Sequence, residues 1–133
     1  MRNLDLLAAQ AAQKIISDTK EQKAAATDVD NLITKTLGVL QENGVYAGLL
    51  YLYSRTTDKP IAQETREQLL ALIPKLGLPT PARTDVSTAL TFLTVNICSD
   101  LDRLLLVKQL WEQTLIYARY GAKARSAAEE VTP

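Results

Sequence analysis

The sequence predicts an all-α protein, a compact single-domain bundle of about six helices. Three observations lead to this prediction. Alanine and leucine dominate the composition while aromatic residues are only 5%, which favours helix over sheet. Apolar residues recur at spacings of three and four along several segments, which is the period of an amphipathic helix. The 133 residues suit one domain with one core. We expect that domain over 1–126, with a disordered tail at 127–133.

Two amphipathic helices are expected at the start of the chain. Asn3 is placed to cap the first helix, because its side chain can accept a hydrogen bond from the first turn. The second helix is expected over 29–42, where Thr27 and Asp30 have the spacing of a capping box. The apolar stripe of the first helix is Leu4, Leu7, Ala8, Ala11, Ile15 and Ile16.

The third helix, expected over 45–54, follows an Asn-Gly pair that interrupts a long apolar run. Gly44 readily adopts the left-handed conformation that ends helices, so the chain should turn a corner there. Three tyrosines follow within eight residues. Stacking platforms for nucleic acids place exposed aromatic rings beside basic residues, and only Arg55 is basic nearby. We therefore interpret the tyrosines as packing residues whose hydroxyls form hydrogen bonds.

A fourth helix is expected over 61–73, because Pro60 suits a first helical turn. On this helix we expect Glu64 and its polar neighbours 66–68 to face water. The segment 74–84 contains three prolines and a glycine, and we interpret it as an internal loop rather than a linker between domains.

The fifth helix, expected over 86–97, begins after a cap at Thr84 or Asp85. Its threonines and valines suit a strand by propensity, but the spacing of its apolar residues favours a helix. A long last helix follows, and Ser99 with Asp102 has the spacing of a capping box at its start. Because this helix is apolar around most of its circumference, we expect it at the centre of the fold.

Composition excludes several classes of function. The chain has no histidine and one cysteine, Cys98, so imidazole-based metal sites, Ser-His and Cys-His nucleophiles and intrachain disulfides are impossible. The longest charge-free run is too short to cross a bilayer, and no signal-peptide pattern is visible at the start. We expect no cofactor, no metal, no membrane partner and a cytoplasmic location.

Charge patterning leaves two interpretations of the last helix. Formal net charge is zero, so any contact with nucleic acid must come from a local patch. Lys108, Glu112, Arg119 and Lys123 form one polar stripe on this helix, and Arg125 lies further along. The stripe is either a solvated edge or a ridge of cations facing phosphates.

The fifth helix carries a face of small uncharged side chains at Ser87, Thr91 and Thr94. Free surfaces usually carry charge, so this face suggests a contact with a neighbouring element or with another copy of the chain. Paired carboxylates occur at helix starts, on a polar helix face and near the C-terminus, where capping and solubility explain them better than catalysis.

Three stretches of the sequence have a distinctive pattern. The first is RNLDLLAAQAAQKI, in which a Leu-Asp pair leads into an alanine-rich helix. The second is LGVLQENGVYAGLLYLYSR, a helix, an Asn-Gly pair and a second helix that ends in a basic residue. The third is YARYGAKA, an aromatic and basic helix ending. Together these stretches resemble the small subunit of the type III-B CRISPR effector, the Cmr complex, or a related type III small subunit.

The resemblance implies a non-catalytic scaffold for antiviral defence. Such subunits stack in several copies along the guide–target duplex of a ribonucleoprotein, beside the backbone subunits that hold the guide RNA. Partners would therefore be the other effector subunits, guide RNA, target RNA and further copies of the chain. The guide reads the sequence, so only backbone contacts are needed. We expect these contacts from Arg55, Lys108, Arg119, Lys123 and Arg125, and more weakly from Lys20 and Lys23.

Two other functions remain open at this stage. One is a helical adaptor or assembly protein that binds only protein partners. The other is a small helical enzyme, for which the sequence offers no recognisable nucleotide motif or phosphate-binding loop.

Overall fold

The computed structural model describes residues 3–131, which form an all-α bundle of six helices. None of these helices combines the length and apolarity needed to cross a membrane. A turn of π-helix, Leu93–Ile97, directly extends the fifth helix, and its wider winding is marked by the Cys98 N–H donating to the Leu93 carbonyl at 2.7 Å. The helices are α1 (Leu4–Glu21), α2 (Ala26–Asn43), α3 (Val45–Ser54), α4 (Lys59–Lys75), α5 (Val86–Phe92) and α6 (Leu101–Val131).

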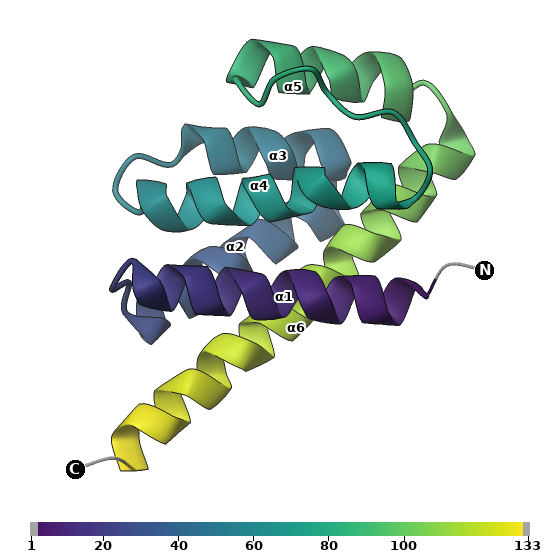
Figure 1. The fold of residues 1–133 in the computed structure, drawn as a ribbon. Helices are drawn as coiled ribbons and strands as arrows, with labels where there is room; N and C mark the ends of the chain where they lie inside the picture. The colour runs from purple at the N-terminus through teal and green to yellow at the C-terminus, as the bar shows by residue number, and fades with distance from the viewer. Residues whose placement is uncertain (1–2, 132–133) are drawn as a thin grey trace.

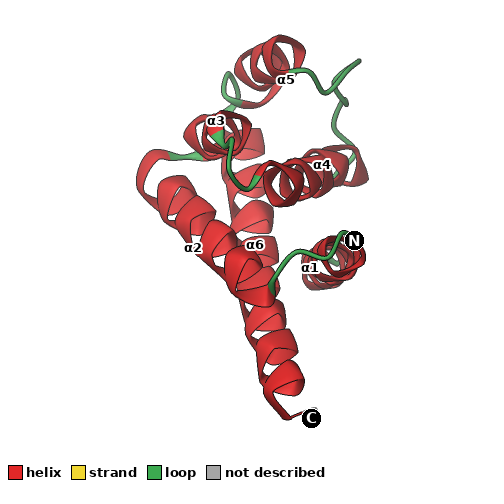
Figure 2. Ribbon diagram, turned by 90° about the vertical axis from the view of Figure 1, so that its left-hand side faces the viewer, coloured by secondary structure: helices red, strands yellow, loops and turns green. Residues whose placement is uncertain are grey.

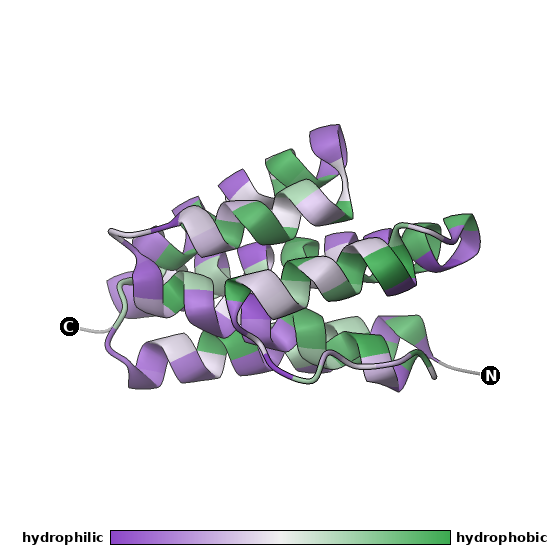
Figure 3. Cartoon of the chain, turned by 90° about the horizontal axis from the view of Figure 1, so that it is seen from above, coloured by the Kyte–Doolittle hydropathy of each residue, from purple (hydrophilic) through white to green (hydrophobic). Residues whose placement is uncertain are grey.

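Helix α6 crosses the whole molecule, and α1, α2, α3 and α4 pack against it (Figure 1). Helices α1 and α2 contact α6 over the greatest length, while α3 and α4 lie above them and α5 lies outermost against α3 (Figure 2). The C-terminal end of α6 projects beyond the bundle at the end opposite α5 (Figure 1). Polar and apolar residues alternate along the helices, as amphipathic packing requires (Figure 3).

The core centres on Trp111 of α6, whose side chain is 1% exposed. Its indole N–H donates to the Leu69 carbonyl of α4 at 2.9 Å, so the largest buried side chain also has its polar group satisfied. Residues from both sides of the loop at 74–84 belong to the same core cluster. The prediction that the last helix is central is confirmed.

Two of the predicted helix caps are confirmed. The Asn3 side chain accepts from the Leu6 N–H at 3.0 Å, and Asp85 accepts from the Thr88 N–H at 3.1 Å. In both cases the cap residue precedes the first turn, where orphan N–H groups need an acceptor.

Two other caps were predicted wrongly. Helix α2 begins one residue before Thr27, so the Thr27–Asp30 pair lies inside the helix and its N-cap, Ala25, provides no side-chain acceptor. The Ser99 hydroxyl donates backwards to the Val95 carbonyl at 2.6 Å, and Asp100 instead accepts from the Arg103 N–H at 3.1 Å. The π-helical turn before Ser99 shifts the start of α6 to Leu101, so the cap moves by one residue.

Helix α6 continues through 127–131, where the sequence predicts a disordered tail; residues 132 and 133 lie outside the described part of the chain. Alanine and glutamate at 127–130 are good helix formers. Arg125 also pairs with Glu129 one turn later, at 2.8 Å between Nε and Oε1, which supports the helix at this end.

The tyrosine interpretation is confirmed for Tyr53. Its hydroxyl donates to the Thr84 carbonyl, which ties α3 to the loop before α5. The guanidinium of Arg66 lies 4.5 Å from the centre of the Tyr53 ring. Tyr51 likewise has Arg55 at 5.5 Å from its ring centre, whereas Tyr46 is exposed at the start of α3.

The corner between α2 and α3 depends on the backbone of Gly44. This residue has φ 97° and ψ −174°, a conformation that only glycine adopts without strain, and its N–H donates to the Leu40 carbonyl at 2.9 Å. We predict that Gly44→Ala destabilises the fold by about 2 kcal/mol, measured as the midpoint of urea unfolding.

Gly38 supplies the matched control for this prediction. It lies inside α2, and a Cβ added there would meet nothing within 4 Å. Gly38→Ala should therefore stabilise the protein by about 0.5–1 kcal/mol through helix propensity. Equal stability of the two variants would contradict the role assigned to the Gly44 backbone.

Candidate functional site

The basic residues expected to contact RNA lie on α6, at the end of α3 and at the end of α1. Lys108, Arg119 and Lys123 share one stripe of α6, as the helical period requires, while Arg125 lies on another face of the same helix. Arg55 ends α3. Lys20 and Lys23 lie at the end of α1, where Lys23 has a left-handed backbone with φ 63°. Of this set, only Lys20 and Arg125 line a common groove, which lies between α1 and α6.

Most of these cations already have an anionic partner within the chain. Arg55 is the most fixed, because its Nε lies 2.9 Å from Asp58 Oδ1 in the α3–α4 loop. The ion pairs on α6 are Lys108–Glu112 at 3.7 Å, Lys123–Asp30 of α2 at 3.1 Å and Arg125–Glu129 at 2.8 Å. The Lys108–Glu112 and Lys123–Asp30 pairs are partly open to water, and surface pairs are each worth about 0–1 kcal/mol, so phosphates can compete for them. The Arg55 and Arg125 side chains are more covered, at 28% and 14% exposed.

Three of the predicted cations, Lys20, Lys23 and Arg119, form no ion pair with the described residues. Lys20 and Lys23 are exposed and form no ion pair with any residue of 3–131. Arg119 is half-buried, and its Nε has no hydrogen-bond partner within the described residues. A buried donor without a partner costs about 1–3 kcal/mol, so an added acceptor would stabilise Arg119, as it would Arg125, whose Nη1 also lacks a partner among these residues.

The face predicted for subunit contact is open to solvent. Ser87, Thr91 and Thr94 are all exposed on α5 and the π-helical turn, and the Thr94 hydroxyl donates to the Thr91 carbonyl at 2.9 Å. Neighbouring elements of the chain therefore do not cover this face. Large apolar residues are also exposed around the corner that leads into α6, with Val95 63%, Leu101 67% and Leu105 54% accessible.

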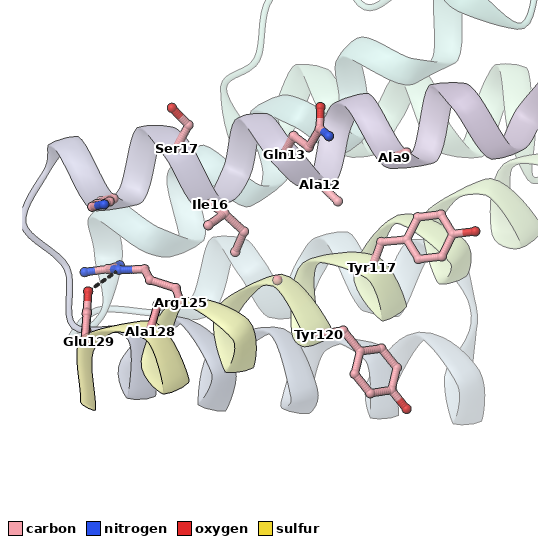
Figure 4. A pocket seen from close by; sticks show the side chains of 12 residues that line it. Ala9, Ala12, Gln13, Ile16, Ser17, Tyr117, Tyr120, Arg125, Ala128 and Glu129 are labelled. Carbon is pink, nitrogen blue, oxygen red and sulfur yellow. Dashed lines mark hydrogen bonds and ion pairs between the residues drawn. The ribbon is translucent and has the colours of Figure 1, made fainter. Parts of the chain in front are cut away.

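A feature that the sequence analysis missed is a groove of about 950 Å³ between α1 and α6 (Figure 4). Its α1 wall carries small and apolar residues, and its α6 wall carries two tyrosines and Gly121. A Cβ at residue 121 would lie 3.0 Å from Ile16 Cγ1, so glycine is needed for the close approach of the two helices. The one sign of this groove in the sequence is Gly121, a glycine inside an otherwise strong helix. The lining residues are Ala9, Ala12, Gln13, Ile16, Ser17, Lys20, Tyr117, Tyr120, Gly121, Arg125, Ala128 and Glu129.

The expectation that Glu64 faces water was wrong. Its side chain is 8% exposed, at the contact between α4 and α1, where it is hydrogen-bonded to Asp18. Gln68 Nε2 donates to Glu64 Oε1 at 3.0 Å, and Lys14 Nζ lies 3.2 Å from Asp18 Oδ2. Burial, and then the hydrogen bond to Asp18, raise the pKa of Glu64 to about 7, while the same hydrogen bond lowers the pKa of Asp18.

Paired carboxyl groups with shifted pKa values also occur in active sites. Here the pair lies in a helix–helix contact, and the Asp18–Glu64 hydrogen bond joins α1 to α4. We therefore assign it a structural role. The single thiol, Cys98, is half-buried, and burial raises its pKa, which disfavours the reactive thiolate.

Within residues 3–131, no group of three or more cysteine, aspartate and glutamate side chains is placed to hold a metal ion. The geometry thus offers ion-paired cations, an uncharged hydroxyl face and an apolar groove, all of which suit binding. Compared with protein-family models, curated proteins and solved structures, the chain shows no match.

The Asp18–Glu64 pair makes stability depend on pH. Between pH 4.5, the usual pKa of a glutamate, and pH 7, folded Glu64 retains a proton that the unfolded chain has lost. Stability should therefore be greatest below about pH 4.5 within this titration, and fall by about 3 kcal/mol as pH rises to 7.5, since one unit of pKa corresponds to about 1.4 kcal/mol. Glu64→Gln should remove this loss, because its amide donates to Asp18 at every pH. Urea unfolding at a series of pH values measures it.

Glu67→Gln is the control for this prediction, because Glu67 also accepts a hydrogen bond on α4, from Gln63 Nε2 at 3.1 Å, but is less buried. This variant should keep the pH dependence of the parent chain. A Glu64→Gln variant with the same pH dependence as the parent would show that Glu64 holds no extra proton in the fold.

Proposed function

We propose that the chain is a non-catalytic small subunit of a type III CRISPR RNA-guided effector, of the III-B or a related subtype. In this proposal it stacks in copies along the guide–target duplex and contacts the RNA backbone during antiviral defence. The observation that carries the proposal is the resemblance of three stretches of the sequence to that family. Two of these stretches meet in space, since the Tyr117 hydroxyl of the third donates to Asp5 of the first.

The charge arrangement supports backbone contact at a small number of positions. Neutral overall charge gives no long-range attraction to RNA, so affinity must come from local cations. Lys20, Lys23 and Arg119 are the least committed within the chain and would bind phosphate without breaking an ion pair. Arg55 and Lys123 would have to exchange Asp58 and Asp30 for phosphate, which lowers the net gain.

A helical adaptor that binds only protein is the second candidate. The exposed hydroxyl face of α5 and the accessible Val95, Leu101 and Leu105 favour it, because contiguous apolar exposure marks interaction surfaces. The same surfaces would also serve contacts between subunits in the first proposal. The presence of RNA therefore separates the two candidates.

Co-purification of the tagged chain from its native host tests the proposal. We expect a stable set of partner proteins together with a guide RNA of defined length. Capture of target RNA should fall as salt rises, because phosphate contacts release counterions. Partners without RNA would support the adaptor and contradict the proposal, and so would a chain that recovers neither partners nor RNA.

Charge reversal extends the same experiment to the α6 stripe. Arg119→Glu with Lys123→Glu should weaken capture of target RNA several-fold at low salt, while the helical content is unchanged. Lys35→Glu with Lys75→Glu is the matched control, since both lysines are exposed on other helices. Equal capture by the two double variants would remove the stripe from the proposed interface.

A further inference from the structure

The groove between α1 and α6 has the size and lining of a ligand-binding site. Its volume of about 950 Å³ lies within the range of about 300–1,000 Å³ typical of such sites, which commonly lie between the helices of bundles. From Tyr117 to Glu129 the groove follows twelve helical steps of α6, or roughly 18 Å at 1.5 Å per residue. It is therefore elongated rather than round; Figure 4 shows side chains that line it.

The walls of the groove are mainly apolar. Ala9 and Ala12 line the α1 side, and their small side chains leave the space open (Figure 4). On the α6 side, Tyr120 is 64% exposed, so a large aromatic surface remains in water. A ligand with an apolar body would remove this surface from water, which is favourable at about 25 cal/mol per Å².

The two ends of the groove differ in charge. Arg125 lies at one end and the tyrosines lie at the other (Figure 4). Lys20 belongs to the Arg125 end, because it lies one turn beyond Ile16 on α1, as Arg125 lies one turn beyond Gly121 on α6, and residues 16 and 121 approach each other closely. Glu129 pairs with Arg125 Nε, while Arg125 Nη1 is buried and has no hydrogen-bond partner within the described chain. Lys20 forms no ion pair with residues 3–131. Two cations therefore face one carboxylate, which leaves this end positive.

We propose that the groove binds a single-chain amphiphile with a carboxylate head, of which a medium-chain fatty acid is the simplest form. The carboxylate lies beside Lys20 and Arg125, and the acyl chain follows α6 towards Tyr117 and Tyr120. Base stacking fits the groove less well, because it needs cations beside the aromatic rings, whereas here they lie at opposite ends. This proposal does not rest on the proposed role in an RNA-guided effector.

Two probes with the same chain and opposite head charges test the proposal on the purified full-length protein. Isothermal titration should show saturable, one-to-one binding of dodecanoate below its micelle concentration, and much weaker binding of dodecyltrimethylammonium. Lys20→Glu should weaken dodecanoate about fivefold, the upper range for one exposed charge contact. Lys35→Glu, a reversal on α2, should leave affinity unchanged.

A second pair of variants tests the location of the site. Ala9→Trp fills the groove and should abolish dodecanoate binding, whereas Gln10→Trp changes an exposed position outside the lining and should not. Circular dichroism confirms that both variants fold. Equal binding of the two probes, or equal affinity of the two tryptophan variants, would overturn the proposal. A concentration-dependent dimer that Ala9→Trp dissociates would assign the groove to a second copy and would also overturn it.

Discussion

The fold depends on the burial of the middle of α6 against four other helices. Trp111 lies at this centre and is the largest fully buried side chain. Its indole N–H donates to the Leu69 carbonyl of α4, so a hydrogen bond as well as packing fixes its position. Val107, Leu115 and Ala118 continue the buried surface on either side of it. Helices α1 and α2 then pack along α6 and leave its last turns projecting from the bundle (Figure 1). The groove and much of the proposed RNA contact therefore lie on the same helix that organises the core.

Charge neutrality shapes how such a chain can bind. Four of the seven cations predicted to contact RNA have a carboxylate within 4 Å, so these positions form local ion pairs and not a continuous basic face. Binding to phosphate then requires exchange of partners, which costs least for the pairs that water reaches, Lys108–Glu112 and Lys123–Asp30. Such a surface adds little affinity in one copy. It suits a protein whose several copies act along one RNA, because many weak contacts then add together.

Local signals predicted most of the fold, and contacts between distant residues account for the misplaced Glu64 and the missed groove. Gly44 marks the α2–α3 corner, and Asn3 and Asp85 cap their helices, because each acts on neighbours in sequence. Glu64 was placed on the wrong surface, since its partner Asp18 comes from another helix. The α1–α6 groove could not be predicted either, because it depends on the angle at which two helices cross.

Nothing in the sequence indicated the ion pair between Lys123 and Asp30 of α2, because the two residues are far apart along the chain. The Ser99 cap failed because a π-helical turn, which has no clear sequence signal here, displaced the start of α6.

Native-state hydrogen exchange along α6 tests most directly the claim that one helix supports both the core and the projecting binding surface. Amides from Val107 to Ala118 should be among the slowest in the protein and exchange only through global unfolding. Amides beyond Arg125, which lie past the packed part of the helix, should exchange at least about a hundredfold faster through local fraying. Uniform protection along α6, or a middle segment that exchanges faster than α1, would contradict the central role of this helix.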